Sequence, residues 1–440
     1  MEYTMNRRRF LKKGASGLIT TAALAGVTPY LFAKDDTVSK PVRIGIIGSG
    51  HRGTDLIQLL LGWPDVSVNA ICDINKNNLN HAIEIVKKIK GNTPAGYSGG
   101  EFDYRNMLKR DDFDAVLIAS PQQWHTVMAI DSMKAGKHVG SEVAAGWELE
   151  QLLELVKVKE STGKRYMLLE NYVYTRMSLM IYNMVQKGIF GNSYYSESAY
   201  IHRTPELYFN SDGTLTWRGH LFTDTYGNFY PTHALGPVSK WFGINDGDRF
   251  DYCVSMMSEP PQMMHKYAVE RCGPESDAAK QKYISGEITP VYIKTVKGKI
   301  IHTINDAQSP RPATNYYLLQ GTNGIYDSRA GIFIDGESEN YRNADDYLAK
   351  YEHSYWKEYS EQAKATGHSG GDYFVMKDFH DMVLYDREPW IDVYDAVAWS
   401  AIVDCSKMSI SQKGERIKIP DFTGGKWEKA DWRKSNMKPA

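Results

Sequence analysis

The stretch Pro41-Val42-Arg43-Ile44-Gly45-Ile46-Ile47-Gly48-Ser49-Gly50-His51-Arg52-Gly53 decides the fold of the first half of this chain. Its apolar run over 42–47 is typical of a buried parallel strand, and residues 54–61 follow with helical spacing. The glycines between them predict a tight turn at Gly48, close approach of a phosphate to Gly50, and close helix–strand contact at Gly53. A strand, this turn and a helix in that order predict a dinucleotide site at the helix N-terminus.

A second apolar run, residues 66–72, ends in Asp73. A carboxylate at the end of the second strand can accept hydrogen bonds from both hydroxyls of a ribose, and it repels a 2′-phosphate. The next residue, Ile74, is not basic. The sequence therefore predicts NAD rather than NADP as the cofactor. A glycine turn with a purely structural use is the alternative.

Strand and helix patterns alternate as far as residue 165, which predicts an α/β Rossmann domain with a doubly wound parallel sheet over residues 41–165. Further strands are expected at 115–119 and 137–141, and a glycine-rich loop at 91–100. The expected helices after the first are residues 79–88, 104–108, 126–134 and 149–162.

After one more strand-like run at residues 166–169, the pattern changes to period-2 alternation, which predicts an α+β substrate-binding domain with a mostly antiparallel open sheet over residues 166–425. The expected strands of this sheet are residues 193–202, 252–258, 291–296, 299–304 and 316–321. Its expected helices are residues 179–187, 373–385 and 393–411. The long polar segments 204–227 and 335–367 are expected to cross its face as loops.

Composition limits the classes of partner. A chain of 440 residues is long enough for two domains, and a net charge of -1 gives no field that would attract nucleic acid or an anionic membrane. The cysteines lack the CxxC spacing of a zinc or redox site, so no metal is predicted. We expect them to be buried as small apolar residues, with one disulfide as the alternative; they are Cys72, Cys253, Cys272 and Cys405.

The N-terminus carries the pattern of a twin-arginine export signal, predicted over residues 1–33. Arg7-Arg8-Arg9-Phe10-Leu11-Lys12-Lys13 precedes a weakly apolar stretch, residues 14–32, that ends at Ala33. That stretch is short and mild for a membrane span. The prediction is export of the folded protein, to the periplasm and without a membrane anchor. An uncleaved anchor and a basic tail are the alternatives.

Two motifs follow the nucleotide turn: Ser120-Pro121-Gln122-Gln123-Trp124-His125, and Ala135-Gly136-Lys137-His138-Val139-Gly140-Ser141-Glu142. From Pro41 onward the chain resembles the glucose–fructose oxidoreductase and inositol dehydrogenase family. That family commonly has a lysine after the glutamate, where this chain has Val143. A sugar dehydrogenase of the usual type would therefore lack a main catalytic group.

Further motifs occur in order: Gln123-Trp124-His125, Ser141-Glu142-Val143, Leu169-Glu170-Asn171, Asn183-Met184-Val185, Gly188-Ile189-Phe190-Gly191, Tyr200-Ile201-His202, Trp217-Arg218, Tyr230-Pro231-Thr232-His233-Ala234-Leu235-Gly236-Pro237, Gly367-His368-Ser369-Gly370-Gly371-Asp372-Tyr373-Phe374 and Pro420-Asp421-Phe422-Thr423. Together they resemble the NAD-dependent α-N-acetylgalactosaminidases of glycoside hydrolase family 109. The resemblance implies sugar contacts from Tyr200, Arg218 and Tyr230. With the nucleotide motif it implies a cofactor site made of Gly48, Gly50, His51, Arg52, Gly53, Asp73, Gln122, Gln123, Trp124, His125, Glu142, Val143, Asn171, Tyr230, Pro231, Thr232 and His233.

The chain departs from this family in two places. A tyrosine that contacts the substrate falls at Ala313, and the family's His-Asp-Leu-Arg is replaced by His202-Arg203-Thr204-Pro205. Tyr316 or Tyr317 could supply the missing phenol, but their alternation in a strand lets only one of them face the cleft. The identity of the sugar is thus less fixed than the chemistry.

An ordinary glycosidase needs two carboxylates beside the scissile bond, and the motifs show no obvious pair. They supply a nicotinamide, tyrosines, a histidine and an arginine, which favours oxidation of the sugar at C3, elimination at C1, addition of water and re-reduction. His233 is the expected acid or base, with Tyr230 beside it. Glu142 is expected to hold the ribose or nicotinamide, and His125 to contact the nucleotide. His368 and Asp372 are expected to close over the sugar, with a helix cap as the alternative for Asp372.

Two other functions remain open at this point. One is an NAD-dependent sugar dehydrogenase or epimerase in which another group compensates for Val143. The other is a sugar-binding protein that retains NAD without catalysis. A dehydrogenase would produce NADH, whereas a glycosidase that recycles its cofactor would not. A binding protein would bind the sugar without turnover. In each case the expected partner is a small molecule or glycan. A homo-oligomer is also possible, because exposed sheets of such domains often pair.

Overall fold

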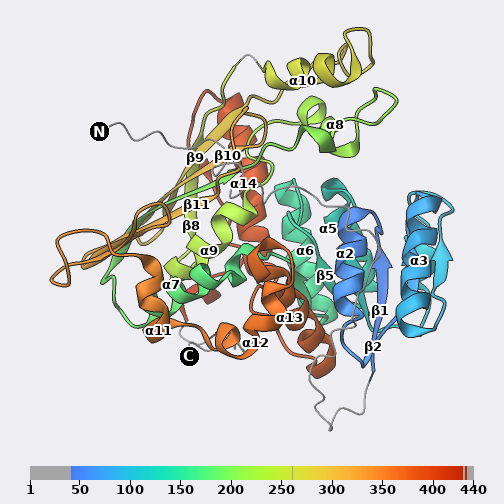
Figure 1. Cartoon of the computed structure of the whole chain (residues 1–440), viewed down its shortest axis with the longest axis horizontal. Coiled ribbons are helices and arrows are strands. Elements are labelled where there is room, and N and C mark those ends of the chain that lie inside the picture. Colours follow the sequence, from blue (N-terminus) through green and yellow to red (C-terminus); the bar gives the residue numbers. More distant parts are fainter. Residues whose placement is uncertain (1–40, 260, 430–431, 434–440) are drawn as a thin grey trace, which may run out of the picture.

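The computed structural model describes residues 41–259, 261–429 and 432–433, so the predicted export signal lies outside the described residues. The chain forms a six-stranded sheet and an eight-stranded sheet. Helices lie between them, and one face of the larger sheet stays open (Figure 1). None of the helices in the described ranges is both long and apolar enough to cross a membrane.

The first sheet is parallel throughout and has the strand order β3-β2-β1-β4-β5-β6. The order reverses between β1 and β4, so a crevice opens at the carboxyl ends of these two strands, where such sheets bind ligands. This confirms the predicted Rossmann fold. Its strands are β1 (Val42–Ile47), β2 (Val66–Cys72), β3 (Ala95–Tyr97), β4 (Ala115–Ile118), β5 (His138–Ser141) and β6 (Tyr166–Leu168).

The helices of this half are α2 (His51–Leu60), α3 (Lys76–Lys90), α4 (Tyr104–Leu108), α5 (His125–Lys134) and α6 (Leu149–Thr162). α2 begins three residues before the predicted start, because Gly50 in extended conformation ends the turn directly before His51. β3 lies within 91–100, which we predicted as a loop. It has only three residues, too few for a recognisable strand pattern in the sequence.

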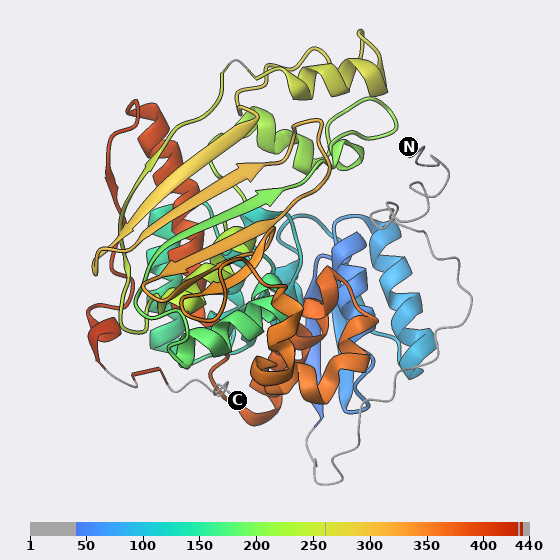
Figure 2. The same cartoon turned by 60° about the vertical axis from the view of Figure 1, so that its left-hand side comes forward.

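The second sheet has the order β13-β12-β11-β7-β10-β9-β8-β14, and only the β7–β10 pair is parallel. This confirms the predicted mostly antiparallel α+β half. Its strands are β7 (Ser193–Ile201), β8 (Phe250–Ser255), β9 (Ile288–Thr295), β10 (Ile300–Asp306), β11 (Tyr316–Gly321), β12 (Gly324–Asp327), β13 (Gly331–Ile334) and β14 (Ile417–Lys418). α7 (Arg176–Gln186), α9 (Thr232–Phe242) and α14 (Val393–Ser411) cover its inner face, and no described helix covers the outer face (Figure 2).

Helix α9 was not predicted, because Pro231, Gly236 and Pro237 are helix breakers. All of its residues are buried, and this packing overrides their local preference. The segments 204–227 and 335–367 also contain helices where we predicted loops. The further helices are α8 (Trp217–Asp224), α10 (Met263–Cys272), α11 (Leu348–Tyr351), α12 (Ser354–Lys364) and α13 (Gly371–Tyr385).

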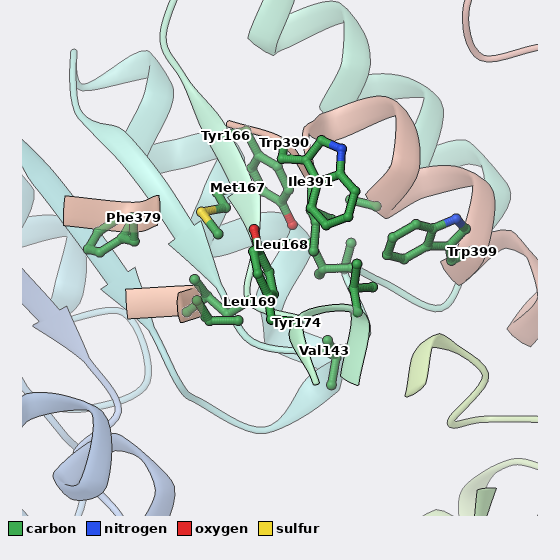
Figure 3. Packing of buried hydrophobic residues seen from close by; sticks show 14 of the residues in the cluster. Val143, Tyr166, Met167, Leu168, Leu169, Tyr174, Phe379, Trp390, Ile391 and Trp399 are labelled. Carbon is green, nitrogen blue, oxygen red and sulfur yellow. The ribbon is translucent and has the colours of Figure 1, made fainter. Parts of the chain in front are cut away.

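Helix α13 belongs to the second half of the chain but packs on the first sheet. A Cβ at Gly140 would lie 2.7 Å from the ring of Phe379, so only glycine admits this ring against β5. β6 lies between Phe379 on one side and Trp390 and Trp399 on the other (Figure 3). One buried apolar cluster therefore extends through both sheets.

Candidate active site

The glycine turn after β1 has the geometry that a dinucleotide requires. Gly48 has φ of +87°, and a Cβ there would lie 2.7 Å from the backbone of Ala119. A Cβ at Gly53 would lie 2.2 Å from the carbonyl oxygen of Gly48. At Gly50 the nearest atom would be the Asn78 amide nitrogen at 3.7 Å, so space remains beside this residue. Two glycines thus permit the close packing, and the third leaves room for a phosphate.

The start of α2 and the end of β2 complete this half of the site. No side chain caps α2, so its first N–H groups remain free for an anion. Asp73 accepts hydrogen bonds from the Ser49 N–H at 2.7 Å and the Asn75 N–H at 2.8 Å, which orient its carboxylate beside the turn. Gly50, Asp73 and Asn75, with Trp124, line a hollow of about 280 Å³. The arrangement fits NAD.

Two buried amide side chains point to the nicotinamide end. Gln122 donates to the Val143 carbonyl at 3.2 Å, but its Oε1 has no partner among the described residues. Asn171 donates to Asp372 at 2.9 Å, and its Oδ1 also lacks a partner within the described chain. A buried acceptor without a donor destabilises the folded protein, because it loses its hydrogen bonds to water. The carboxamide N–H₂ of a nicotinamide is a donor that could bind these oxygens.

The other predicted cofactor residues are placed differently. Both ring nitrogens of His125 lie against carbonyl oxygens, of Ala144 at 2.7 Å and Ser120 at 2.8 Å, and burial lowers its pKa. It therefore ties two loops together. Gln123 is exposed, and the side chain of His51 is 79% exposed at the start of α2.

Arg52 joins three elements through buried charges. Its guanidinium donates to Glu142 at 2.6 Å and to both oxygens of Asp372 at 2.8 and 2.9 Å. Burial acts to raise the pKa of each carboxyl, but Arg52, with His368 at Asp372, outweighs it and lowers both values. Asp372 makes no cap to its own helix and binds the His368 ring at 2.8 Å instead. Both carboxylates thus remain ionised and paired.

His233 is held in one orientation by Glu170. Its Nδ1 lies 2.8 Å from each carboxylate oxygen, and since these oxygens only accept, Nδ1 carries the hydrogen. Glu170 is fully buried and also accepts from the Tyr172 N–H at 2.9 Å. Nε2 has no hydrogen-bond partner in the described part of the chain. This nitrogen is therefore the one available to a substrate.

The backbone of His233 is fixed as well. Pro237 lies four residues later in α9 and has no N–H to donate to the His233 carbonyl. The Tyr317 hydroxyl donates to this carbonyl at 2.7 Å instead. Tyr316 lies on the opposite face of β11, under the Arg329 guanidinium at 4.3 Å. Of the two tyrosines, Tyr317 thus faces the site, and its hydroxyl is already used.

An aromatic wall surrounds His233. The rings of Tyr172, Tyr200 and Tyr230 lie 4.7, 5.1 and 5.1 Å from its ring, and Tyr200 stacks on Tyr230 at 4.9 Å and on His202 at 4.5 Å. Burial raises the pKa of Tyr230 to about 12 and lowers that of His202 to about 4. Neutral hydroxyls on flat apolar rings suit a pyranose, which has one apolar face and hydroxyl edges.

Arg218 is the unpaired cation of the site. Its guanidinium lies 4.3 Å from the ring centre of Trp217 and forms no ion pair or hydrogen bond with any described residue. Its charge partly offsets the rise in the pKa of Tyr200 and Tyr230 that burial causes. Ala313 lies in an exposed loop. Arg218 is therefore the group near the aromatic wall that is free to bind a ligand oxygen.

Comparison with known proteins identifies the family. Residues 174–429 match the family described as "Glycosyl hydrolase 109, C-terminal domain", and residues 42–170 match "Oxidoreductase family, NAD-binding Rossmann fold". An alpha-N-acetylgalactosaminidase from Shewanella oneidensis is 36% identical over 97% of this chain and 98% of its own length. A glycosyl hydrolase family 109 protein from Shewanella putrefaciens has the same identity and coverage.

The chain belongs to glycosyl hydrolase family 109. It is a glycoside hydrolase that uses NAD, as predicted. A levoglucosan dehydrogenase in complex with NADH shares the fold, with a TM-score of 0.68 and 16% identity over 87% of this chain and 100% of that one. An NAD binding oxidoreductase from Klebsiella pneumoniae has a TM-score of 0.67 and 15% identity over 87% and 99%.

Several residues of this family 109 site had no role in the sequence prediction. Glu170, Tyr172 and His202 lie within the quoted motifs or next to them, and the structure brings all three to His233. Glu170 follows β6 at the carboxyl edge of the sheet, and this position was the available signal. In the described ranges the four cysteines are free and no cluster of ligands could hold a metal.

Proposed function

We propose that this family 109 enzyme removes terminal α-linked N-acetylgalactosamine, or a related sugar, from a glycan by transient oxidation at C3. The observation that carries the proposal is the buried Glu170–His233 pair, which presents one free imidazole nitrogen among tyrosine hydroxyls. The Shewanella oneidensis relative, an alpha-N-acetylgalactosaminidase, supports the choice of sugar.

The carboxylates near the site do not suit ordinary acid catalysis of hydrolysis. That route needs one carboxylic acid whose pKa is raised. Arg52 lowers the pKa of both Glu142 and Asp372 and binds one oxygen of Glu142 and both of Asp372, while Glu170 binds His233. Bound NAD supplies reversible oxidation at C3, which acidifies the C2 proton and permits elimination at C1 before water adds and C3 is reduced again.

The chain's own residues orient the sugar and move protons. His233 Nε2 takes the C2 proton of the oxidised sugar, exchanges it with solvent and supplies a proton to C2 later in the cycle, while Glu170 stabilises the imidazolium through Nδ1. The Tyr230 and Tyr200 hydroxyls donate to sugar oxygens, and Tyr230 passes a proton. Arg218 donates to the acetamide carbonyl, since its guanidinium has no other acceptor in the described chain.

The cofactor contacts divide along the crevice. The turn and α2 hold the pyrophosphate, and Asp73 holds the ribose hydroxyls. The nicotinamide end is assigned to Gln122, Asn171 and the residues beside them. The full set proposed is Gly48, Gly50, His51, Arg52, Gly53, Asp73, Gln122, Gln123, Trp124, His125, Glu142, Val143, Asn171, Tyr230, Pro231, Thr232 and His233.

The test uses the purified holoenzyme and an aryl N-acetyl-α-galactosaminide. We expect aglycone release without net NADH, loss of release when NAD is stripped, and recovery when it is returned. Net NADH without aglycone release would instead indicate a dehydrogenase. Sugar binding with neither product would indicate a binding protein.

We further propose that the enzyme is exported by the twin-arginine route and acts in the periplasm. The support is the pair Arg7-Arg8 ahead of a weakly apolar stretch that ends at Ala33. Export of a folded protein also suits an enzyme that must carry its nucleotide with it. Fractionation of cells that express Arg7→Lys, Arg8→Lys and wild type tests this, and equal periplasmic amounts would contradict it.

The open face of the second sheet is proposed to pair two copies of the chain. Tyr292 is 47% exposed and stacks on His302 at 4.4 Å, and Ile300 is 38% exposed on the same face. Apolar side chains together on an uncovered sheet are typical of an interface. Light scattering of Ile300→Glu and wild type checks this, with a dimer expected for wild type only. A wild-type monomer would refute it.

A further inference from the structure

The hollow at the nucleotide turn has one wall from the second half of the chain. Its lining comes from the first sheet, with residues such as Gly50, Asp73 and Trp124, and from Trp217 of α8. α8 lies beyond the carboxyl ends of the first sheet, where β1 points (Figure 1). We propose that the Trp217 indole closes this hollow over bound NAD and slows its release. The inference rests on the proposed function, in which one NAD serves many turnovers.

The first turn of α8 is held firmly. The Thr216 hydroxyl accepts from the Gly219 N–H at 3.2 Å and donates to the Leu207 carbonyl at 2.6 Å. A Cβ at Gly219 would lie 2.3 Å from the Tyr208 carbonyl oxygen, so only glycine allows this close contact. Trp217 lies between these two anchors and is therefore placed by the fold.

The indole is also packed from behind. Trp217 contacts a buried cluster that includes Tyr208, Phe222 and Ala144, the last of which follows β5. The Arg218 guanidinium stacks on it at 4.3 Å. Yet Trp217 is only partly buried, and it lines the hollow. An indole that packs against buried residues and still borders a hollow is suited to cover a planar or apolar ligand group.

Trp217 and Arg218 are consecutive residues that lie beside two different sites, the dinucleotide hollow and the aromatic wall. Trp217 lines the dinucleotide hollow, while the charge of Arg218 acts on Tyr200 and Tyr230 of the aromatic wall. The first turn of α8 thus lies between the cofactor and the sugar. An enzyme that restores its cofactor in each cycle gains from slow NAD release, and a large fixed side chain at the opening provides it.

The experiment compares Trp217→Ala, Trp217→Phe and wild type, with His220→Ala as the matched control. His220 is exposed on the same helix and does not line the hollow. We expect Trp217→Ala to raise the Kd for NADH and its release rate by about 10- to 100-fold, Trp217→Phe by much less, and His220→Ala not at all. Titration of stripped enzyme with NADH and stopped-flow release give both values without turnover.

Energy transfer from tryptophan to NADH gives a second measurement if Trp217→Ala fails to fold. Trp217→Phe should retain NADH but lose a clear part of this transfer. Unchanged affinity in Trp217→Ala, or unchanged transfer in Trp217→Phe, overturns the proposal, and so does a loss of sugar binding alone. Absence of NADH binding in wild type would overturn the proposed function too, whereas wild-type binding and hydrolysis beside an unaffected Trp217→Ala would overturn this inference only.

Discussion

At the scale of single residues, His233 is held from two directions that its sequence context does not reveal. Glu170 fixes the imidazole, and the Tyr317 hydroxyl replaces the backbone donor that Pro237 lacks. Both contacts are buried, so each also removes a polar group from an unfavourable environment. His233 therefore presents one ring nitrogen in one orientation.

Glu170→Gln tests the first contact. The amide cannot hold Nδ1–H with a full negative charge, so we expect kcat to fall by about 100-fold with little change in KM. Steady-state kinetics measure both parameters. The exposed Glu361→Gln is the control, and equal kcat in the two variants would remove Glu170 from the mechanism.

Tyr317→Phe tests the second contact. It leaves the buried His233 carbonyl without its donor, so we expect a loss of about 1–3 kcal/mol in the free energy of unfolding, and a lower kcat. Tyr316→Phe is a closely matched control, since Tyr316 is the next residue of β11 and faces away from the site. Denaturant unfolding of the two variants measures the loss in the free energy of unfolding for each. Equal losses would show that the hydroxyl of Tyr317 carries no special role.

The residues of the site could be predicted in part. Gly48, Gly50, Gly53 and Asp73 follow from local spacing, since a turn between a strand and a helix is a local property. The partnership of Glu170 with His233 joins positions 63 residues apart, and no local pattern encodes it. For the same reason, Asp372 was predicted to close over the sugar or to cap its helix, and not to be the partner of Arg52.

At the scale of elements, α2, the end of β5 and the start of α13 meet at Arg52. Arg52 lies in the first turn of α2, and Asp372 comes from the start of α13, 320 residues later in the chain. Gly371 makes this approach possible, because a Cβ there would lie 2.2 Å from the Asn171 carbonyl oxygen. The pairing thus couples the cofactor side of the molecule to the sugar side.

Asp372→Asn tests this junction. It leaves Arg52 buried with a single counter-charge, so we expect a loss of about 3–5 kcal/mol in the free energy of unfolding and weaker NADH binding. The folded-state pKa of Asp372 is depressed, so its contribution is present above the ordinary carboxyl pKa of about 4 and is lost as the pH falls. Unfolding against pH, with the exposed Asp346→Asn as control, should show the difference shrink in acid. A pH-independent difference would contradict this.

Strands and amphipathic helices with clear periodicity could be predicted, whereas elements that depend on burial could not. β9 (Ile288–Thr295) alternates between buried and more exposed residues, and α3 and α7 each have one apolar face. α9 contains two breakers of local structure and is helical because the surrounding layers bury it completely. β3 is three residues long and depends on its neighbour β2 for every hydrogen bond.

At the scale of the whole molecule, the two sheets share one core, and α13 fastens the second half of the chain onto the first. His380 of α13 reaches Asp65, just before β2, at 2.9 Å and also lies 3.2 Å from Asp381. Burial acts to lower the pKa of His380, but the two carboxylates outweigh it and raise the value. The protonated imidazole therefore joins the two halves.

The sign of this coupling predicts a pH dependence. A histidine with a raised folded-state pKa contributes its full stability below the ordinary value of about 6.5, and that contribution is lost as the pH rises through the folded-state value. We therefore expect the difference in free energy of unfolding between wild type and His380→Gln to be largest in mild acid and to diminish toward alkaline pH. Denaturant unfolding at several pH values measures it. A difference that grows with pH would contradict the assignment.

This family 109 enzyme is proposed to break a glycosidic bond by passing through an oxidised sugar. The most direct test is NMR of the released sugar after the holoenzyme cleaves an aryl N-acetyl-α-galactosaminide in heavy water. We expect deuterium at C2 of the product, without accumulation of NADH, because the proton removed from C2 exchanges with solvent before C2 is protonated again. Released sugar with no deuterium at C2 would contradict the claim and require a carboxylate pair that acts directly on the bond.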